Sequence, residues 1–566
     1  MAGHVNMMDD CLISNLPPAT LRSALRLLIS QGSATQRSFV EHVRAKFIEN
    51  PPSFEPPAKL FPRFDIVSPE CLAYIAQTRC MFSCKLARES LPYLEHFIKA
   101  IPQARVECGE DSDLVELLWE FDGDIVQAIQ ALKESRPEAS PELLMSLKDL
   151  RVSLDICERY CEHAKDLFFP FDRARRQVCD VIDIFFPNER AGPSSRWSWE
   201  SPIIPILPKE SSRRKVETFR LGPFEYIPRL FIGLWQLSSP SWGSCPAEGH
   251  CIDLVHAVEC GLVAADMADH YGDAEIVYGD FRNVLSPEIR HTVYAATKWC
   301  IFSPLSEPVT TSFVLDAVRE RCRRLQGRVE LLQFHWQNYE SKEYLDILVE
   351  LFRISKSHPD LVTTIGLCNF DSEHTEEVCE YLLAKTGLVG IVSNQVQFSL
   401  VDARPLQRMV HVCGKYGLKL LTYGSLCGGF LSERWLRQPA PEMYQESNKL
   451  TPSQRKYFDM IRTWGTWSEF QALLECLSTI ARKHGVAIPN VATRWVLQQR
   501  AVGAVVVGAT LGVSDHVDDN LRMFDFQLYD SDISNINAIA LGPSGGKARA
   551  VFEKLGDCGN EYRKMH

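Results

Sequence analysis

The stretch Val-Glu-Leu-Leu-Gln-Phe-His at residues 329–335 is a short apolar run that ends in a polar residue, His335. The run at 262–266 ends in Asp266, and the run at 292–297 is followed directly by Lys298. Tyr271 lies five residues beyond Asp266. A barrel of alternating strands and helices carries its chemistry at the carboxyl ends of its strands, so this spacing predicts both the fold and the position of a site.

Eight apolar runs of this kind alternate with helical patterns in the C-terminal two thirds of the chain. They lie at 229–233, 262–266, 292–297, 329–334, 361–367, 389–396, 418–423 and 502–508. Their number and spacing are typical of an α/β fold of the (β/α)8 barrel type. The interval between the last two runs is much longer than the others, and it predicts an enlarged loop at the mouth of the barrel.

The first third of the chain has the apolar periodicity of helices instead. Segments 19–31, 35–48 and 80–101 carry it, and Ser140-Pro141 is a capping side chain followed by a first-turn proline. One long helix that ends at Pro170 is predicted by a seam of residues at spacings of four and three: Leu143, Leu147, Leu150, Leu154, Cys157, Cys161, Ala164 and Phe168. We expect the seam to pack within its own domain, and pairing with a second chain is the alternative.

These patterns divide the chain into four parts. We expect an all-α domain of unknown role at 1–186, a linker rich in proline, serine and charge at 187–216, the barrel at 217–541 and a tail at 542–566. More than one domain is also expected because 566 residues are too many for a single core.

The net charge of −11 argues against a general binder of nucleic acid or of anionic membranes, and it favours a small-molecule partner. No run approaches 18 uncharged apolar residues, so we expect no membrane span. Residues 1–10 lack the basic start and apolar core of a secretory signal, and the 19 cysteines lack the spacing of a disulfide scaffold. We therefore expect a cytoplasmic protein with reduced thiols.

Two cysteine pairs have helical spacing, Cys80 with Cys84 and Cys157 with Cys161. Zinc would need further Cys or His ligands from elsewhere in the chain. Because free cysteine is among the most buried residue types, we expect inert, buried thiols and no metal site.

Asp266, Tyr271, Lys298 and His335 each have an ordinary structural explanation when taken singly, as a helix cap, a packed ring, a surface charge or a core histidine. Their shared placement at strand ends favours chemistry. Tyrosine has a pKa near 10, and a lysine cation beside it lowers that pKa. Asp266 would hold the Lys298 ammonium, and a neutral His335 would orient a substrate carbonyl. The set predicts proton transfer to a carbonyl oxygen, with hydride from a cofactor, because no side chain donates one.

Seven motifs over about residues 220–541 resemble, in order and spacing, those of the aldo-keto reductase superfamily. They are Gly233-Leu-Trp-Gln236, Asp266-Met-Ala-Asp-His-Tyr-Gly-Asp-Ala-Glu275, Ala296-Thr-Lys-Trp299, Leu332-Gln-Phe-His335, Ile365-Gly-Leu-Cys-Asn-Phe370, Ser393-Asn-Gln-Val396 and Asp518-Asp-Asn-Leu521. The first third of the chain is outside this resemblance.

The resemblance implies a catalytic tetrad of Asp266, Tyr271, Lys298 and His335, with Tyr271 as proton donor. It implies that Asn369 and Gln395 bind the nicotinamide carboxamide and that Tyr423 stacks on the nicotinamide. Cys368 stands where the family usually has serine, which implies a weaker hydrogen bond there. The remaining residues implied to contact the cofactor are Ser425, Leu426, Gly428, Gly508, Thr510, His516 and Asn520.

One departure from the family concerns the choice of cofactor. Many relatives read Gly-Ala-Arg-Leu-Gly where this chain has Gly508-Ala-Thr-Leu-Gly512, so a guanidinium that could pair with an adenosine 2′-phosphate is lost. His516 is a weaker candidate for that contact. The resemblance implies NADPH, and NADH is not excluded.

Three tryptophans lie beside the predicted strand ends: Trp235, Trp299 and Trp336. They predict an aromatic pocket for apolar or planar carbonyl substrates, with packing in the core as the alternative.

The leading hypothesis is an NAD(P)H-dependent oxidoreductase that reduces aldehydes or ketones to alcohols, or runs the reaction in reverse. The alternative is a regulatory or binding protein that keeps the fold and senses the nucleotide, with its N-terminal helices docking a protein partner. Self-association through those helices is a third use for them.

Overall fold

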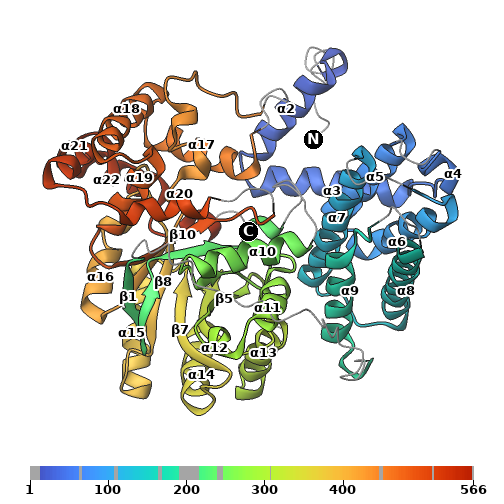
Figure 1. Cartoon of the computed structure of the whole chain (residues 1–566), viewed down its shortest axis with the longest axis horizontal. Coiled ribbons are helices and arrows are strands. Elements are labelled where there is room, and N and C mark those ends of the chain that lie inside the picture. The colour runs from blue at the N-terminus through green and yellow to red at the C-terminus, as the bar shows by residue number, and fades with distance from the viewer. Residues whose placement is uncertain are drawn as a thin grey trace, which may run out of the picture.

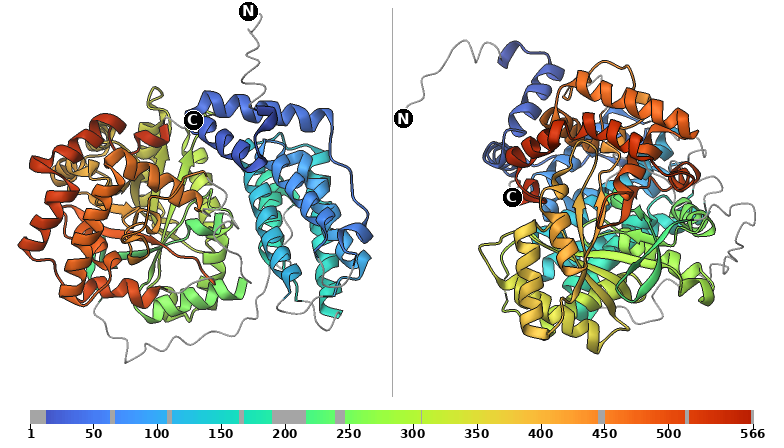
Figure 2. Two further views of the ribbon diagram at one scale, coloured as in Figure 1. Left: turned by 90° about the horizontal axis from the view of Figure 1, so that it is seen from above. Right: turned by 90° about the vertical axis from the view of Figure 1, so that its left-hand side faces the viewer.

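The structure is a computed structural model that describes residues 13–62, 67–107, 112–163, 168–189, 216–238, 247–305, 307–444, 450–512 and 516–563. The helices of the first third lie beside a barrel formed by the rest of the chain (Figure 1, Figure 2). Among the described residues, no helix combines the length and the apolar character needed to cross a membrane.

Eight parallel strands close into a barrel, in the order β10-β3-β4-β5-β6-β7-β8-β9. The predicted (β/α)8 barrel is therefore confirmed, and each predicted run is a strand. Strands β5 and β6 continue past Lys298 and His335, so these side chains project from the strands themselves. The strands are β3 (Leu230–Gly233), β4 (Ala264–Asp266), β5 (Tyr294–Ile301), β6 (Val329–Trp336), β7 (Val362–Cys368), β8 (Ile391–Gln397), β9 (Lys419–Tyr423) and β10 (Val502–Gly508).

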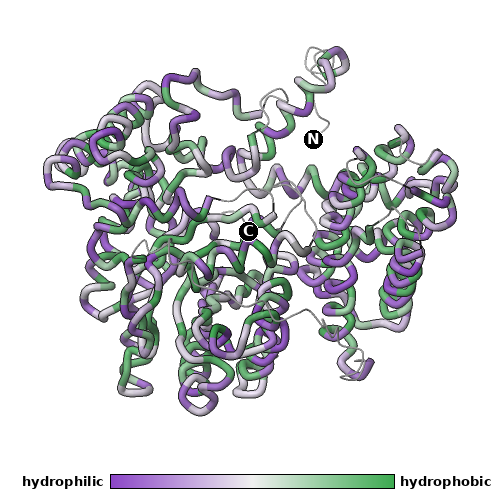
Figure 3. Tube along the Cα trace, viewed as in Figure 1, coloured by the Kyte–Doolittle hydropathy of each residue, from purple (hydrophilic) through white to green (hydrophobic). Residues whose placement is uncertain are grey.

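Side chains along each strand alternate between the barrel interior and the layer of surrounding helices. On β5, Ala296 packs in the interior cluster whereas Ala295 packs toward the helices. The hydropathy colouring shows apolar residues along the central strands and mixed polar and apolar stretches on the outer helices (Figure 3). Those helices are α10 (Ala247–Glu259), α11 (Ala274–Val284), α12 (Pro287–Arg290), α13 (Thr311–Arg324), α14 (Glu343–Ser357), α15 (Ser372–Thr386), η6 (Arg404–Leu406) and α16 (Met409–Tyr416).

A hairpin of β1 (Thr218–Leu221) and β2 (Phe224–Pro228) closes the floor of the barrel. A Cβ added at Gly503, at the start of β10, would lie 2.3 Å from the Phe219 ring. Phe224 meets the Tyr294 ring edge-on at 5.0 Å, at the start of β5. The sequence patterns did not predict this hairpin, because its strands are short and half-exposed.

The predicted enlarged loop between β9 and β10 holds three helices and lies at the mouth. Tyr457 covers the turn after β9 so closely that a Cβ at Gly424 would lie 2.4 Å from its hydroxyl. The elements of the loop are η7 (Cys427–Gly429), η8 (Glu433–Trp435), α17 (Pro452–Trp464), α18 (Trp467–His484) and α19 (Ile488–Leu497). After β10 come α20 (Val517–Leu521), η9 (Arg522–Phe524), α21 (Asp530–Ala540), η10 (Pro543–Gly545), α22 (Gly546–Leu555) and α23 (Asn560–Arg563).

The first third forms α2 (Pro18–Ile29), α3 (Ser33–Glu49), α4 (Pro57–Leu60), α5 (Pro69–Ser83), α6 (Ala87–Ala104), α7 (Asp113–Ser135), α8 (Pro141–His163), α9 (Asp172–Phe185) and η1 (Pro187–Glu189). The predicted helical segment 80–101 falls on the end of α5 and on α6, and it is interrupted where the chain turns between them. Lys85 has a φ of 66° there, a left-handed conformation that interrupts a helix. Helices α2 and α3 bury none of their residues and expose Leu27, Leu28 and Phe39.

Helix α8 begins as predicted, with the Ser140 hydroxyl accepting a hydrogen bond from the Leu143 amide. Its apolar seam from Leu143 to Cys161 is buried in the core of the helical part, so packing within the same domain is confirmed. The described part of the helix reaches His163, and Phe168, the last predicted member of the seam, is 53% exposed, so the seam does not include Phe168. Ala164 lies outside the described residues, as do residues 190–215 of the predicted linker. The four-part division of the chain stays a prediction.

The cysteine pairs at helical spacing are only partly buried. Cys84, Cys157 and Cys161 are buried, whereas Cys80 is exposed, so the expectation of a buried thiol is wrong at Cys80.

Candidate active site

An acid and an amine meet inside the barrel. Asp266 ends β4 and Lys298 lies on the neighbouring strand β5, and both side chains point inward. The Lys298 amine donates to Oδ2 of Asp266 at 2.6 Å and to the Met267 carbonyl at 3.0 Å. Burial alone lowers the pKa of Lys298, but Asp266, together with Tyr271 and Cys368, raises that pKa above its ordinary value, so the amine is an ammonium ion.

Two glutamines complete the hydrogen bonding of Asp266. Gln333 and Gln395 each donate to Oδ1 of Asp266, at 2.8 Å and 2.6 Å. Gln395 also donates to the Gln333 side chain at 3.0 Å. Sequence reasoning missed Gln333, although its place two residues before His335 puts both on the same face of β6. Through its two hydrogen bonds, the amide of Gln395 faces Asp266 and Gln333 in this structure.

Tyr271 lies on the loop between β4 and α11, with its ring centre 4.7 Å from the Lys298 amine. Burial raises the pKa of the Tyr271 phenol above its ordinary value, and Lys298 is the strongest influence that opposes the rise. The predicted net lowering of this pKa is therefore wrong for the structure as it stands. The phenol keeps its proton at neutral pH.

His335 is held through one ring nitrogen. Its Nδ1 lies 3.0 Å from the Cys368 carbonyl, and because a carbonyl only accepts, we infer that Nδ1 carries the proton. Its Nε2 is buried without a hydrogen-bond partner among the described residues. Burial, with a smaller contribution from His270, lowers the pKa of His335 to about 4. The ring is neutral at pH 7, and Nε2 is free to accept a hydrogen bond.

The other residues at the ends of β7 and β9 lie close together. Oδ1 of Asn369 accepts a hydrogen bond from the Tyr423 hydroxyl at 2.9 Å. Asn369 has a φ of 59°, a left-handed conformation that asparagine adopts more readily than most residues. Ser425 is buried, and its hydroxyl has no partner among the described residues. Cys368 is buried, and burial raises the pKa of its thiol to about 12.

The C-terminal helix α23 lies over these same side chains. The Tyr562 hydroxyl is 3.2 Å from the Tyr423 hydroxyl and accepts from the Lys456 amine at 2.7 Å. Its ring centre is 6.4 Å from that of His335. Arg563 donates to the Asn369 carbonyl at 3.0 Å. No pattern in the sequence predicted these contacts.

A separate pocket lies beside the end of β10. Four of the residues expected to bind the cofactor line this pocket, namely Gly508, Thr510, His516 and Asn520. Asp253 of α10, which the sequence did not point out, lines it as well. Oδ2 of Asp253 accepts from the Gly512 amide at 2.6 Å. Leu426 and Gly428 lie elsewhere, and Gly428 is covered by Tyr457.

Two of the three predicted pocket tryptophans are core residues. Lys298 and His335 point inward, so their neighbours Trp299 and Trp336 point outward. Trp299 packs against Phe313 and Phe334, and Trp336 is likewise buried. A pocket role for Trp299 and Trp336 is therefore wrong, whereas Trp235, in η4 (Trp235–Ser238), is 40% exposed. The aromatic ring found near His335 instead is Phe302, at 5.4 Å.

The side chains fit a nicotinamide nucleotide in their chemistry. Asn369 offers an amide, Tyr423 offers a ring and the unpartnered hydroxyl of Ser425 lies buried nearby. The Gln395 amide would have to release Asp266 and Gln333 to join them. The pocket around Thr510 is separate from this group and suits the other end of such a molecule. The Lys456 amine lies 5.6 Å from the centre of the Tyr423 ring, so it would have to move before a planar ring could stack on that face.

Comparisons with known proteins point to one family. Residues 229–541 match the aldo/keto reductase family. Flagellar radial spoke protein 5 of Chlamydomonas reinhardtii is 29% identical over 181 residues, 30% of this chain, and the match spans only 33% of that relative. Chloroplastic pyridoxal reductase of Arabidopsis thaliana is 26% identical over 328 residues, 55% of this chain and 82% of that protein.

The NADH-specific methylglyoxal reductase of Escherichia coli is 22% identical over 341 residues, which are 56% of this chain and 95% of that protein. The family match covers more than half of the 566 residues, and it coincides with the closed eight-stranded barrel. The match begins after the helical part, which it leaves unassigned. This chain belongs to the aldo/keto reductase family.

Proposed function

We propose that the protein is an NAD(P)H-dependent oxidoreductase that interconverts aldehydes or ketones with alcohols, and that Tyr271 is its proton donor. One observation carries the proposal. The Lys298 ammonium lies 2.6 Å from Asp266 and 4.7 Å from the centre of the Tyr271 ring. A buried ammonium beside a phenol is an arrangement for moving a proton at that phenol.

Lys298 stabilises the phenolate that Tyr271 forms during the reaction more than it affects the protonated phenol before the reaction. The phenol is protonated at rest, since burial raises its pKa. Once it gives its proton to a substrate oxygen, the phenolate lies beside an ammonium that Asp266 already holds in place. Charge that appears during the reaction is then met by a group that needs no rearrangement. The nicotinamide cofactor, when bound, supplies the hydride.

His335 orients the substrate oxygen. With Nδ1 donating to the Cys368 carbonyl, the free Nε2 accepts a hydrogen bond and cannot donate one. It therefore suits the hydroxyl of an alcohol better than the oxygen of a carbonyl. This favours a protein that also works in the direction of alcohol oxidation.

The cofactor residues proposed from the sequence fall into two groups. Asn369, Gln395, Tyr423 and Ser425 would hold the nicotinamide end, and the pocket around Thr510 would hold the adenosine. Asp253 lines that pocket, and a carboxylate there repels a 2′-phosphate. We propose that NADH serves alongside NADPH. The relative named an NADH-specific reductase supports this within the family.

The test is turnover of the whole protein with NADPH and NADH in parallel. The aldehyde panel includes pyridoxal and methylglyoxal because two relatives carry these names. Tyr271→Phe is expected to lower kcat about 10²- to 10⁴-fold, the usual range for a lost general acid, and to leave cofactor binding unchanged. Tyr278→Phe is the matched control, because that buried hydroxyl donates to the Tyr294 carbonyl outside the site. Full activity in Tyr271→Phe contradicts the assignment.

The regulatory alternative is favoured by α23. Because Tyr562 accepts a hydrogen bond from the Tyr423 hydroxyl and lies beside the His335 ring, we expect a nicotinamide ring bound there to displace the C-terminal helix and so signal the presence of the nucleotide. The relative named a flagellar radial spoke protein is compatible with such a role. Nucleotide binding without turnover over the whole panel would favour this alternative. A partner surface or self-association at the N-terminal helices stays a prediction.

A further inference from the structure

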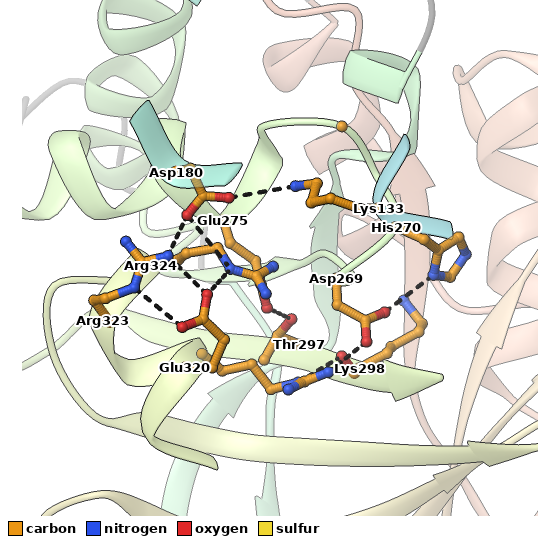
Figure 4. Close-up of polar contacts among 12 residues, drawn as sticks. Lys133, Asp180, Asp269, His270, Glu275, Thr297, Lys298, Glu320, Arg323 and Arg324 are labelled. Carbon is orange, nitrogen blue, oxygen red and sulfur yellow. Dashed lines mark hydrogen bonds and ion pairs between the residues drawn. The ribbon is translucent and has the colours of Figure 1, made fainter. Parts of the chain in front are cut away.

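The loop that carries Tyr271 is fastened to the barrel on one side. Asp269, two residues before Tyr271, forms an ion pair with Arg321 of α13. The same carboxylate accepts from the Cys300 amide at 3.2 Å. Figure 4 shows the Asp269 carboxylate facing His270, with Lys298 beside them. Oδ1 of Asp269 lies 3.2 Å from Nδ1 of His270. The start of the loop is therefore fixed by the catalytic part of the molecule itself.

The other end of the loop is held by the helical part. Arg173 of α9 makes a two-pronged ion pair with Asp273, two residues after Tyr271, at 2.6 Å and 3.0 Å. Arg173 also donates to the Leu237 carbonyl at 2.8 Å. The two side chains are only 6% and 1% exposed. Asp273 is the residue before α11, yet its carboxylate makes no capping bond to that helix and is turned to Arg173 instead.

Gly272, between Tyr271 and Asp273, is enclosed by the helical part as well. Its carbonyl accepts from the Gln177 amide of α9 at 3.3 Å. A Cβ at Gly272 would lie 3.0 Å from the Val126 side chain of α7, and the φ of 59° is one that glycine adopts freely. The backbone on the carboxyl side of Tyr271 is thus in contact with two helices from the first third of the chain.

Helix α9 is itself firmly placed. The amide of Ala174 donates to the Asp122 carboxylate of α7 at 2.8 Å. Further along, Asp180 pairs with Lys133 of α7 and with Arg323 of α13 (Figure 4). Arg176 pairs with Asp280 of α11. The pairs of Asp180 with Arg323 and of Arg176 with Asp280 join the two parts of the molecule without a hydrogen bond to the Tyr271 loop.

We propose that Arg173 is a positioning residue for Tyr271, through which the helical part of the chain becomes a working component of the reductase site. The proposal depends on the proposed function, because it assumes that Tyr271 donates the proton. It gives the first third of the chain a role that no family resemblance supplies.

The physical reason is the deep burial of the Asp273 charge. Burial alone raises the pKa of Asp273, and Arg173 brings it below its ordinary value. Without Arg173 the carboxylate must turn toward water or take up a proton. Either change frees the backbone beside Tyr271. A displacement of about 1 Å at a reacting group can cost about 10²-fold in rate.

The experiment uses full-length Arg173→Gln, with Arg176→Gln as the matched control on the same helix. In Arg173→Gln, kcat is expected to fall about 10²-fold. The dissociation constants of NADPH and NADH, measured by quenching of tryptophan fluorescence, should stay within about twofold, and KM should change less than kcat. Arg176→Gln should keep kcat within about threefold, because its ion pair is with Asp280 of α11 and its influence on Asp273 is weaker than that of Arg173. Arg173→Lys restores the charge next to Asp273 and should recover much of the lost kcat.

A second measurement separates this proposal from the proposed function. Amide hydrogen exchange over residues 267–273 should become faster in Arg173→Gln and not in Arg176→Gln, whether or not the protein turns over a substrate. Faster exchange without any turnover in the unaltered protein would reject the enzymatic function and keep the structural part of the proposal. Unchanged exchange, an equal loss of kcat in both variants, or no recovery in a folded Arg173→Lys would overturn it.

Discussion

Lys298 carries a full charge inside the barrel, and its partners explain how the protein tolerates it. Asp266 accepts hydrogen bonds from Lys298, Gln333 and Gln395, which come from three different strands. A buried ion pair is stable only when its remaining lone pairs are satisfied in this way. The burial of the Lys298 ammonium therefore depends on Asp266, and Asp266 in turn depends on the hydrogen bonds from Gln333 and Gln395.

His335 gives a prediction about acid stability. Its pKa in the folded protein is about 4, below the ordinary value of 6.5, so between these pH values the unfolded chain binds a proton that the folded protein does not. The free energy of unfolding should therefore fall as the pH is lowered from about 6.5 to about 4, by roughly 3 kcal/mol from this residue. Urea unfolding at pH 7, 5.5 and 4 measures the fall, which should be smaller in His335→Gln.

His250 is the matched comparison for this prediction. It is buried near the Arg173–Asp273 pair, and burial lowers its pKa to about 3, so His250→Gln should also reduce the acid dependence. An unchanged pH dependence in His335→Gln would show that this ring takes up its proton in the folded protein.

At the scale of elements, α23 has the clearest consequence. In this short helix, Tyr562 contacts Tyr423 and Arg563 donates to the Asn369 carbonyl. Because Tyr562 contacts both the Tyr423 hydroxyl and the His335 ring, we expect a nicotinamide ring bound beside these residues to compete with the helix.

Tyr562→Ala is therefore expected to tighten NADPH binding about tenfold. The cofactor then no longer displaces the hydrogen bond between Tyr423 and Tyr562, worth about 0.5 to 1.5 kcal/mol, or the contact between the Tyr562 and His335 rings. Fluorescence titration measures the dissociation constant. Lys554→Ala, an exposed change on the neighbouring α22, should leave it unaltered. Weaker binding in Tyr562→Ala would mean that α23 supports the cofactor and does not compete with it.

The elements also show what a single sequence can predict. The eight strands were predictable because each apolar run has its own local pattern. The same alternation that turns Lys298 inward turns Trp299 outward, so the error about Trp299 came from neglecting a rule that the sequence already contained. The break at Lys85 had no local signal, because the apolar periodicity continues across it.

Contacts between distant residues were not predictable in this way. Arg173 and Asp273 are 100 residues apart, and Tyr423 and Tyr562 are 139 apart. Nothing in the residues around either one specifies the other. Each is an ordinary charged or aromatic residue until the packing of whole elements brings the pair together.

At the scale of the whole molecule, the two parts share buried charge. Asp180 of the helical part pairs with Lys133 of the same part and with Arg323 of the barrel. If the parts separated, these groups would be exposed together. We therefore expect the full-length protein to unfold in a single cooperative transition.

Asp180→Asn should disturb this cooperativity. Breaking a buried pair on one side typically costs about 3 to 5 kcal/mol, so the variant should be less stable and show two resolved transitions. Scanning calorimetry, with the ratio of calorimetric to van't Hoff enthalpy, measures both. Glu116→Gln, on an exposed position of α7, serves as the control. Two transitions in the unaltered protein would contradict the expectation.

The hairpin of β1 and β2 seals the floor of the barrel with Phe219 and Phe224. Protons that reach Tyr271 and Lys298 from bulk water must then enter at the opposite, open end of the barrel. In the proposed reaction Tyr271 gives up its phenol proton in each turnover, and water entering at the open end of the barrel has to replace that proton.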